Sequence, residues 1–137
     1  MGDAFEELDE RLIDWIGEQH VFFVATAPAE GGHVNLSPKG HDSLRVLDPR
    51  TIAYLDLTGS GAETIAHARE TGRMTIMLCA FEGPPRILRL YGQGVAHPLG
   101  SARYEELVDL FPRMPGASSI VGLPIGRGQT SWRYSIP

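Results

Sequence analysis

The residues from Leu57 to Thr64 combine the features of a phosphate-binding turn. This segment, LTGSGAET, follows a predicted strand and precedes a predicted short helix. Thr58, Ser60 and Thr64 supply hydroxyls, the glycines allow close backbone approach, and the first N–H groups of a helix have no intrahelical partners. The segment is neither a Walker A loop nor a GxGxxG fingerprint. The alternative is an ordinary helix start, with Ser60 as N-cap and Glu63 completing a capping box.

A lysine is the second candidate. Lys39 lies in the segment NLSPKG, after a short alternating stretch and a proline, with His33 and His41 on either side. An ammonium group in such a loop is suited to contact a phosphate or an electron-rich ring. The alternative is a solvated lysine in a turn.

The segment PRILRLY contains the third candidate. Arg86 and Arg89 are three positions apart, so on a strand they point to opposite faces and one of them faces a potential site. The alternative for each is a surface charge or an ion pair. Other chemistry has little support: the five histidines are scattered without an HExxH motif, no GxSxG elbow is present, and the single cysteine, Cys79, lies in an apolar strand. We therefore expect no metal site.

Composition narrows the class of protein. The chain has 137 residues, which fits one domain over 1–137. With 12 basic and 17 acidic residues its net charge is −5, so a nucleic-acid-binding surface is not expected. No apolar run is long enough to span a membrane, and the N-terminus is acidic where a signal peptide would be basic. These features predict a cytoplasmic protein without membrane association.

The periodicity of apolar residues predicts an antiparallel arrangement. An amphipathic helix is expected first, followed by hairpin-like strands with a short helix between them, then a third helix and two weaker strands. This order is typical of a mainly β (α+β) fold, a sheet or barrel with helices outside it. The predicted helices cover residues 3–17, 62–70 and 101–111, and the predicted strands cover 20–26, 33–37, 44–47, 51–57, 73–81, 86–96, 118–122 and 129–136.

Four segments together resemble a known family. VNLSPKG, the stretch from YLDLTGSGAETIAHARETG through RILRLYGQG, SARYEELVDLF and QTSWRYSIP look like the pyridoxamine 5′-phosphate oxidase-like FMN-binding split-barrel proteins, in particular their pyridoxamine 5′-phosphate oxidase-related group. The resemblance covers nearly the whole chain. It implies an antiparallel split barrel flanked by short helices, and a homodimer that holds FMN at the subunit interface.

The resemblance also implies positions for the cofactor. Residues 34–37 and Lys39 match the strand under the flavin, 54–56 match the strand beside it, and the turn before Thr64 matches the phosphate-binding turn. Arg86 is included as a source of positive charge for the phosphate. The predicted cofactor-binding residues are Asn35, Ser37, Lys39, Leu55, Asp56, Thr58, Ser60, Gly61, Thr64 and Arg86.

The sequence departs from true pyridoxamine 5′-phosphate oxidases in two places. Those enzymes have an Arg-Lys pair where this chain has Ser60 and Gly61, and their basic C-terminal substrate motif has no counterpart here. Trp132-Arg133 also stands where close relatives have Cys-Gly. We therefore expect an FMN-dependent oxidoreductase of unassigned substrate that is not a true pyridoxamine phosphate oxidase. The alternatives are a deazaflavin-dependent reductase and a non-catalytic protein that binds flavin or another small ligand.

Overall fold

The fold is a curled antiparallel sheet with three short helices around it. The computed structural model describes residues 3–57 and 62–131. In chain order the elements are β1 (Ala4–Phe5), α1 (Glu10–Glu18), β2 (Phe22–Thr26), β3 (Asn35–Lys39), β4 (Leu44–Asp48), β5 (Thr51–Leu57), α2 (Ala62–Glu70), β6 (Arg73–Cys79), β7 (Ile87–Gln93), β8 (Val95–Pro98), α3 (Ala102–Leu107), a 3-10 turn (Val108–Leu110) and β9 (Ala117–Ser131).

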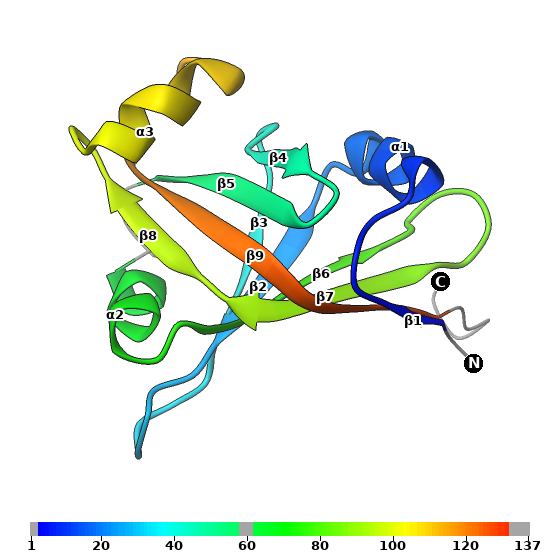
Figure 1. Ribbon diagram of the computed structural model, residues 1–137, viewed down its shortest axis with the longest axis horizontal. Helices are drawn as coiled ribbons and strands as arrows, with labels where there is room; N and C mark the ends of the chain where they lie inside the picture. The colour runs from blue at the N-terminus through cyan, green and yellow to red at the C-terminus, as the bar shows by residue number, and fades with distance from the viewer. Residues whose placement is uncertain (1–2, 58–61, 132–137) are drawn as a thin grey trace.

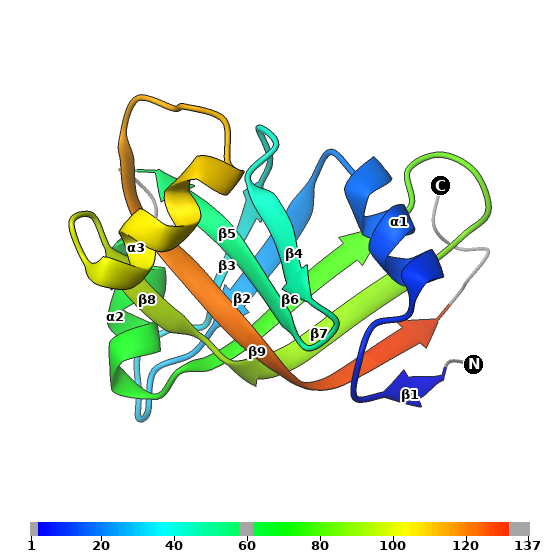
Figure 2. The same cartoon turned by 45° about the horizontal axis from the view of Figure 1, so that its top comes forward.

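The sheet curls until its two edges approach each other. The strand order is β3-β2-β6-β7-β9-β5-β4, and β1 and β8 pair with β9 outside this path. Every described pairing is antiparallel. The long β9 crosses the middle of the molecule (Figure 1), and the open side of the half-barrel is visible in Figure 2. The edge strands β3 and β4 follow one another in the chain with only residues 40–43 between them. This confirms the expected split barrel with short flanking helices.

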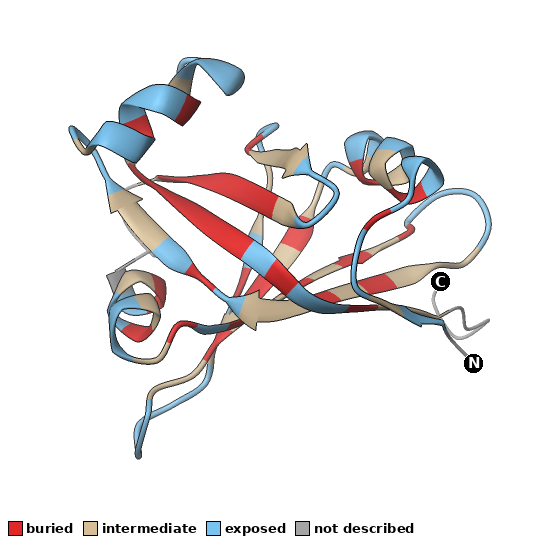
Figure 3. Cartoon of the chain, in the orientation of Figure 1, coloured by how far each residue is buried: buried red, intermediate tan, exposed pale blue. Residues whose placement is uncertain are grey.

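Two clusters of apolar side chains cover the two faces of β5. Ile52 and Tyr54 point into the barrel with residues of α1, β2, β6 and β7, whereas Ala53 and Leu55 pack against α3 on the outside. β5 is therefore buried along nearly its whole length (Figure 3). This double coverage explains why its sequence is almost continuously apolar rather than alternating.

Glycines permit a sharp bend where β7 meets β9. The register shifts between Tyr91 and Gly92, and a Cβ at Gly92 would collide with the carbonyl oxygen of Pro124. Such a register shift marks a β-bulge. The predicted single strand over 86–96 is wrong, however, because it divides into β7 and β8, which pair with different parts of β9.

Other boundaries also differ from the sequence-based expectation. The first helix begins at Glu10 rather than at residue 3, because Ala4 and Phe5 pair with β9 and Asp9 caps the helix, its Oδ1 accepting from the Leu12 N–H at 2.8 Å. The two weak strands predicted near the C-terminus are one continuous strand, β9, within the described residues. The predicted third helix becomes irregular after Leu107, where a 3-10 turn follows. The remaining predicted elements are present with boundaries shifted by a few residues.

Candidate functional site

Three predicted residues project from the same face of β3. Because side chains alternate along a strand, Asn35, Ser37 and Lys39 share one face while Leu36 and Pro38 take the other. The first group is half-buried or buried, and Leu36 and Pro38 are exposed. β3 therefore presents an amide, a hydroxyl and an ammonium to the inside of the half-barrel.

Lys39 forms an ion pair across the split. Its Nζ lies 3.3 Å from Oδ1 of Asp56 on β5, and the two side chains are 11% and 3% exposed. The same ammonium lies 5.4 Å from the centre of the Tyr54 ring. An ion pair this well shielded from solvent joins two strands that share no ladder of hydrogen bonds.

Asn35 makes a second connection, at the other end of β3. Its Nδ2 donates to Oγ1 of Thr64 at 2.9 Å, and Thr64 on α2 is fully buried. Asp56 and Thr64 lie on either side of residues 58–61 in the chain. The two β3 contacts therefore bracket the turn that the sequence marks as a phosphate cradle. Thr58, Ser60 and Gly61, three of the predicted cofactor-binding residues, lie outside the described residues.

Three buried hydroxyls near these contacts have no hydrogen-bond partner among the described residues. They belong to Ser37, between Asn35 and Lys39 on β3, to Tyr54, whose ring lies beside the Lys39 ammonium, and to Ser119 on β9, which is paired with Asp56 on β5. Burial raises the pKa of Tyr54 strongly, and the negative charge of Asp56 adds to the effect. Buried polar groups are normally hydrogen-bonded, and a bound ligand is one way to satisfy those that are not.

A hollow of about 400 Å³ opens beside the ion pair. It lies between the end of β3 and the end of β5, and the loop after Lys39 forms one of its walls. This volume is within the range of about 300–1,000 Å³ typical of small-molecule sites. Its lining is Val21, Pro38, Lys39, Gly40, His41, Ser43, Leu55, Asp56 and Leu57. The structure thus brings together Lys39, Leu55 and Asp56 from the predicted set.

Asn35, Ser37 and Thr64 are outside this lining, and Arg86 lies in a different part of the molecule. It precedes β7, three strands from β3 in the sheet order, and its guanidinium lies 5.5 Å from the centre of the Trp15 ring on α1. It lines a separate hollow near the N-terminal strand. Its predicted contact with a cofactor has no support from this placement.

Sequence reasoning did not assign Val21 or Ser43 to the site. Val21 precedes β2, which pairs along β3 so that Phe22 lies opposite Lys39. The predicted hairpin of the two alternating segments points to Val21, because pairing Phe22 with Lys39 places the neighbouring Val21 close to this lysine. Among the described residues, no cluster of three metal-ligating side chains exists, and no helix is long and apolar enough to cross a membrane.

Comparison with known proteins identifies relatives of this chain. No family model matches it. The pyridoxamine 5′-phosphate oxidase family protein ustO of Aspergillus flavus is 42% identical over 137 residues, which cover 97% of this chain and 55% of that protein. The chain therefore spans about half the length of this curated relative.

Solved structures of split barrels resemble the whole fold. A candidate pyridoxamine 5′-phosphate oxidase from Lactobacillus delbrueckii matches with a TM-score of 0.69 and 19% identity, over 90% of this chain and 94% of that one. An FAD-binding protein from Mesorhizobium loti matches with a TM-score of 0.61 and 11% identity, over 96% and 99% of the two chains. Over nearly its whole length the chain is thus similar in sequence to a pyridoxamine 5′-phosphate oxidase family protein, and its fold is that of the split barrels.

Proposed function

We propose that this protein binds a flavin, FMN, in the hollow between β3 and β5 and uses it as an oxidoreductase. The observation that supports this most is the pair of contacts from β3, Lys39 to Asp56 and Asn35 to Thr64, on either side of residues 58–61. In the chain, the two β3 partners Asp56 and Thr64 flank the segment whose sequence suits a phosphate. The name of the Mesorhizobium protein, an FAD-binding protein, agrees with a flavin ligand.

Polar groups in and next to the hollow suit a flavin. A flavin ring system offers carbonyl oxygens and ring nitrogens, and the Lys39 ammonium lines the hollow. The buried hydroxyls of Ser37 and Tyr54, which are outside the lining, lack partners among the described residues. The Lys39 ammonium is already paired with Asp56, so these two side chains together contribute no net charge. The phosphate would then be held mainly by hydroxyls and main-chain N–H groups of the turn before Thr64, as its sequence predicts.

FMN is proposed rather than FAD because the sequence has one phosphate-like turn and no dinucleotide fingerprint. When bound, a flavin supplies the hydride or electron transfer itself. The tasks left to the protein are to fix the ring, to exclude water from one side of it and to leave the other side open. The shielded ion pair performs the first task by holding β3 against β5.

A homodimer is part of the proposal. β3 is an edge strand, Leu36 on its outer side is 66% exposed, and Val34, just before the strand, is 69% exposed. Edge strands with exposed apolar side chains are usually covered, since they otherwise pair with other chains. A second subunit packed here would cover the strand that carries Lys39 and would bring the flavin to the subunit boundary.

The test is a spectrum of the purified protein followed by an FMN titration. Flavin absorbance, or binding of added FMN, is expected, and mass spectrometry of the released ligand should show FMN. The double variant Lys39→Met/Asp56→Asn removes both charges without leaving either one unpaired. A charge-assisted contact contributes roughly 1.5–3 kcal/mol, so its FMN affinity should fall about ten- to a hundredfold.

Arg50→Ala is the matched control. Arg50 forms an exposed ion pair with Glu7 at 3.2 Å, and it directly precedes β5, at the end of the strand opposite to Asp56. Its FMN affinity should remain that of the unmodified protein. Equal losses in both variants would refute the assignment of the site. Release of FAD or a deazaflavin would refute the choice of cofactor, and FMN binding without turnover by a reduced nicotinamide would refute the proposed activity.

A further inference from the structure

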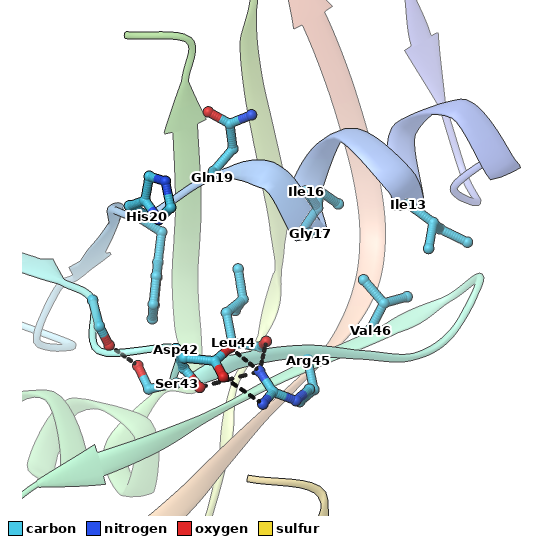
Figure 4. A pocket seen from close by; sticks show the side chains of 12 residues that line it. Ile13, Ile16, Gly17, Gln19, His20, Asp42, Ser43, Leu44, Arg45 and Val46 are labelled. Atoms are coloured by element: carbon cyan, nitrogen blue, oxygen red, sulfur yellow. Dashed lines mark hydrogen bonds and ion pairs between the residues drawn. The ribbon is translucent and has the colours of Figure 1, made fainter. Parts of the chain in front are cut away.

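A second hollow, of about 320 Å³, lies between α1 and β4. Figure 4 shows Ile13 on the helix and Val46 on the strand pointing toward one another across it. Its apolar lining consists of Ile13, Ile16, Phe22, Leu44 and Val46. This hollow contains none of the residues that the sequence assigned to the cofactor.

The two hollows share a wall. Gly40 and Ser43 line both of them, so the loop between β3 and β4 separates one from the other. Within this loop His41 and Asp42 have φ angles of 59° and 55°, in the left-handed region that side chains other than glycine rarely adopt. Such strain persists only where surrounding contacts enforce it, and it is frequent at ligand sites.

Arg45 supplies the enforcing contacts. Its Nη1 donates to Oδ1 of Asp42 at 2.8 Å, its Nη2 donates to Oδ2 at 3.2 Å, and its Nε donates to the carbonyl of Leu110 at 2.8 Å. The guanidinium also holds the pKa of the Asp42 carboxyl below its usual value. The loop is therefore fastened both to β4 and to the 3-10 turn after α3.

These contacts leave the second hollow without an uncompensated charge from Arg45 or Asp42. The other polar lining side chains are also engaged: Ser43 Oγ donates to the Gly40 carbonyl at 2.6 Å, and Gln19 Nε2 donates to the Trp15 carbonyl at 2.9 Å. His20 remains, on the exposed rim. An anion buried here would lose its hydration and gain no counter-charge, whereas burial of an apolar group is favourable.

We propose that the hollow between α1 and β4 is a second ligand site, which takes a small, neutral and largely apolar molecule. Its position across the loop from the first hollow puts that molecule beside the flavin, and this part of the inference rests on the proposed function. The chemistry of the lining selects against phosphorylated and other anionic compounds. It thereby narrows the class of substrate for the proposed activity.

Gly17 allows the site to be blocked without disturbing its neighbours. It lies on α1 four residues after Ile13, hence on the same face, and lines the hollow. A Cβ placed on it has no atom within 4 Å. Gly17→Leu therefore adds bulk to the hollow while favouring the helix. Glu18→Leu is the matched control, because Glu18 is the next residue, is exposed and is absent from the lining.

The experiment is an NMR titration of the isotopically labelled full chain with 2-naphthol, which is neutral, and with naphthalene-2-sulfonate, an anion of similar shape. Amide shifts at Gly17, Leu44 and Val46 are expected with 2-naphthol, and the sulfonate should bind about tenfold more weakly or less, because its charge has no partner. Gly17→Leu should weaken 2-naphthol binding about tenfold or more by filling the hollow. Glu18→Leu should leave it unchanged.

FMN affinity, measured on the same variants, separates this inference from the proposed function. It should be equal in all three proteins, because Gly17 is not in the first hollow. Equal binding of the two naphthalenes, shifts centred elsewhere, or no effect of Gly17→Leu would overturn the second site even if FMN binds. If the unmodified protein does not bind 2-naphthol and Gly17→Leu changes the oligomeric state, the hollow is instead covered by a second copy of the chain. Shifts as expected without FMN binding would support the second site and refute the proposed function.

Discussion

Lys39 on β3 and Asp56 on β5 form a nearly solvent-free ion pair of 3.3 Å across the split of the barrel. Removal of charges from water is costly, so such a pair adds little net stability, but loss of one partner leaves the other buried and uncompensated. Its effect here is to fix the distance between two strands that do not hydrogen-bond to each other.

Lys39→Met should therefore lower the free energy of unfolding much more than the double variant does. The single substitution leaves the Asp56 carboxylate unpaired, at a cost of about 3–5 kcal/mol for a buried pair. Lys39→Met/Asp56→Asn has no buried charge and should recover most of this loss. Urea denaturation of both variants is the measurement, and equal stabilities would show that solvent already screens the pair.

Tyr54→Phe should stabilise the protein or leave its stability unchanged. The Tyr54 hydroxyl is buried with no partner among the described residues, and an unsatisfied group of this kind costs about 1–3 kcal/mol. The variant should also lose less stability above pH 10. The folded state raises the pKa of Tyr54, so at high pH the unfolded chain releases a proton that the folded chain keeps, which favours unfolding.

Thermal unfolding at pH 7 and at pH 10.5 checks both statements. Tyr91→Phe is the control, because Tyr91 is half-buried on β7 and its removal tests a general effect of losing a tyrosine. A Tyr54→Phe protein clearly less stable than the unmodified one at pH 7 would mean that the hydroxyl has a partner in solution.

The sequence identified most elements because their periodicity is local. The apolar run 51–57 and the helix 62–70 match β5 and α2 residue for residue. β9 was missed as one strand because Gly122, Pro124 and Gly126 are typical of turns. The strand continues through them because different partners take over along its length, with β5 and β8 on one part and β1 and β7 on the other.

The candidate site was predictable in its parts but not in its assembly. Lys39 and Asp56 were each named, yet their ion pair depends on how far the sheet curls, which no local pattern encodes. Arg86 shows the same limit. The spacing of Arg86 and Arg89 predicts which faces of a strand they take, but the distance of Arg86 from β3 follows from the strand order of the whole sheet.

His97 should make the protein less stable in mild acid. Burial lowers the pKa of His97, and the positive charge of Arg103 adds to the effect. Below about pH 6.5, the ordinary value, the unfolded chain therefore binds a proton that the folded chain does not, and stability falls with pH. His97→Gln should reduce this fall between pH 7 and pH 5. His33→Gln, in an exposed loop, should not, and equal slopes in the two variants would contradict the prediction.

Leu36→Glu should separate the proposed dimer. Leu36 is 66% exposed on the outer side of β3, so a carboxylate there is harmless in a monomer but would be buried between two subunits. An obligate interface typically buries more than about 2,000 Å², and a charge near its centre commonly prevents association. Leu99→Glu is the control, because Leu99 is 64% exposed but lies in the turn before α3.

Sedimentation at low micromolar concentration distinguishes the possible results for the dimer. The unmodified protein and Leu99→Glu should sediment as dimers and Leu36→Glu as a monomer, with normal folding by circular dichroism. The Leu36→Glu monomer should also bind FMN more weakly, because in the proposed dimer the flavin lies at the boundary beside β3. If that monomer retained full FMN affinity, the site would be complete within one chain. If Leu36→Glu remained dimeric, β3 would not be the interface, and the exposed edge of β3 would no longer support the proposed dimer.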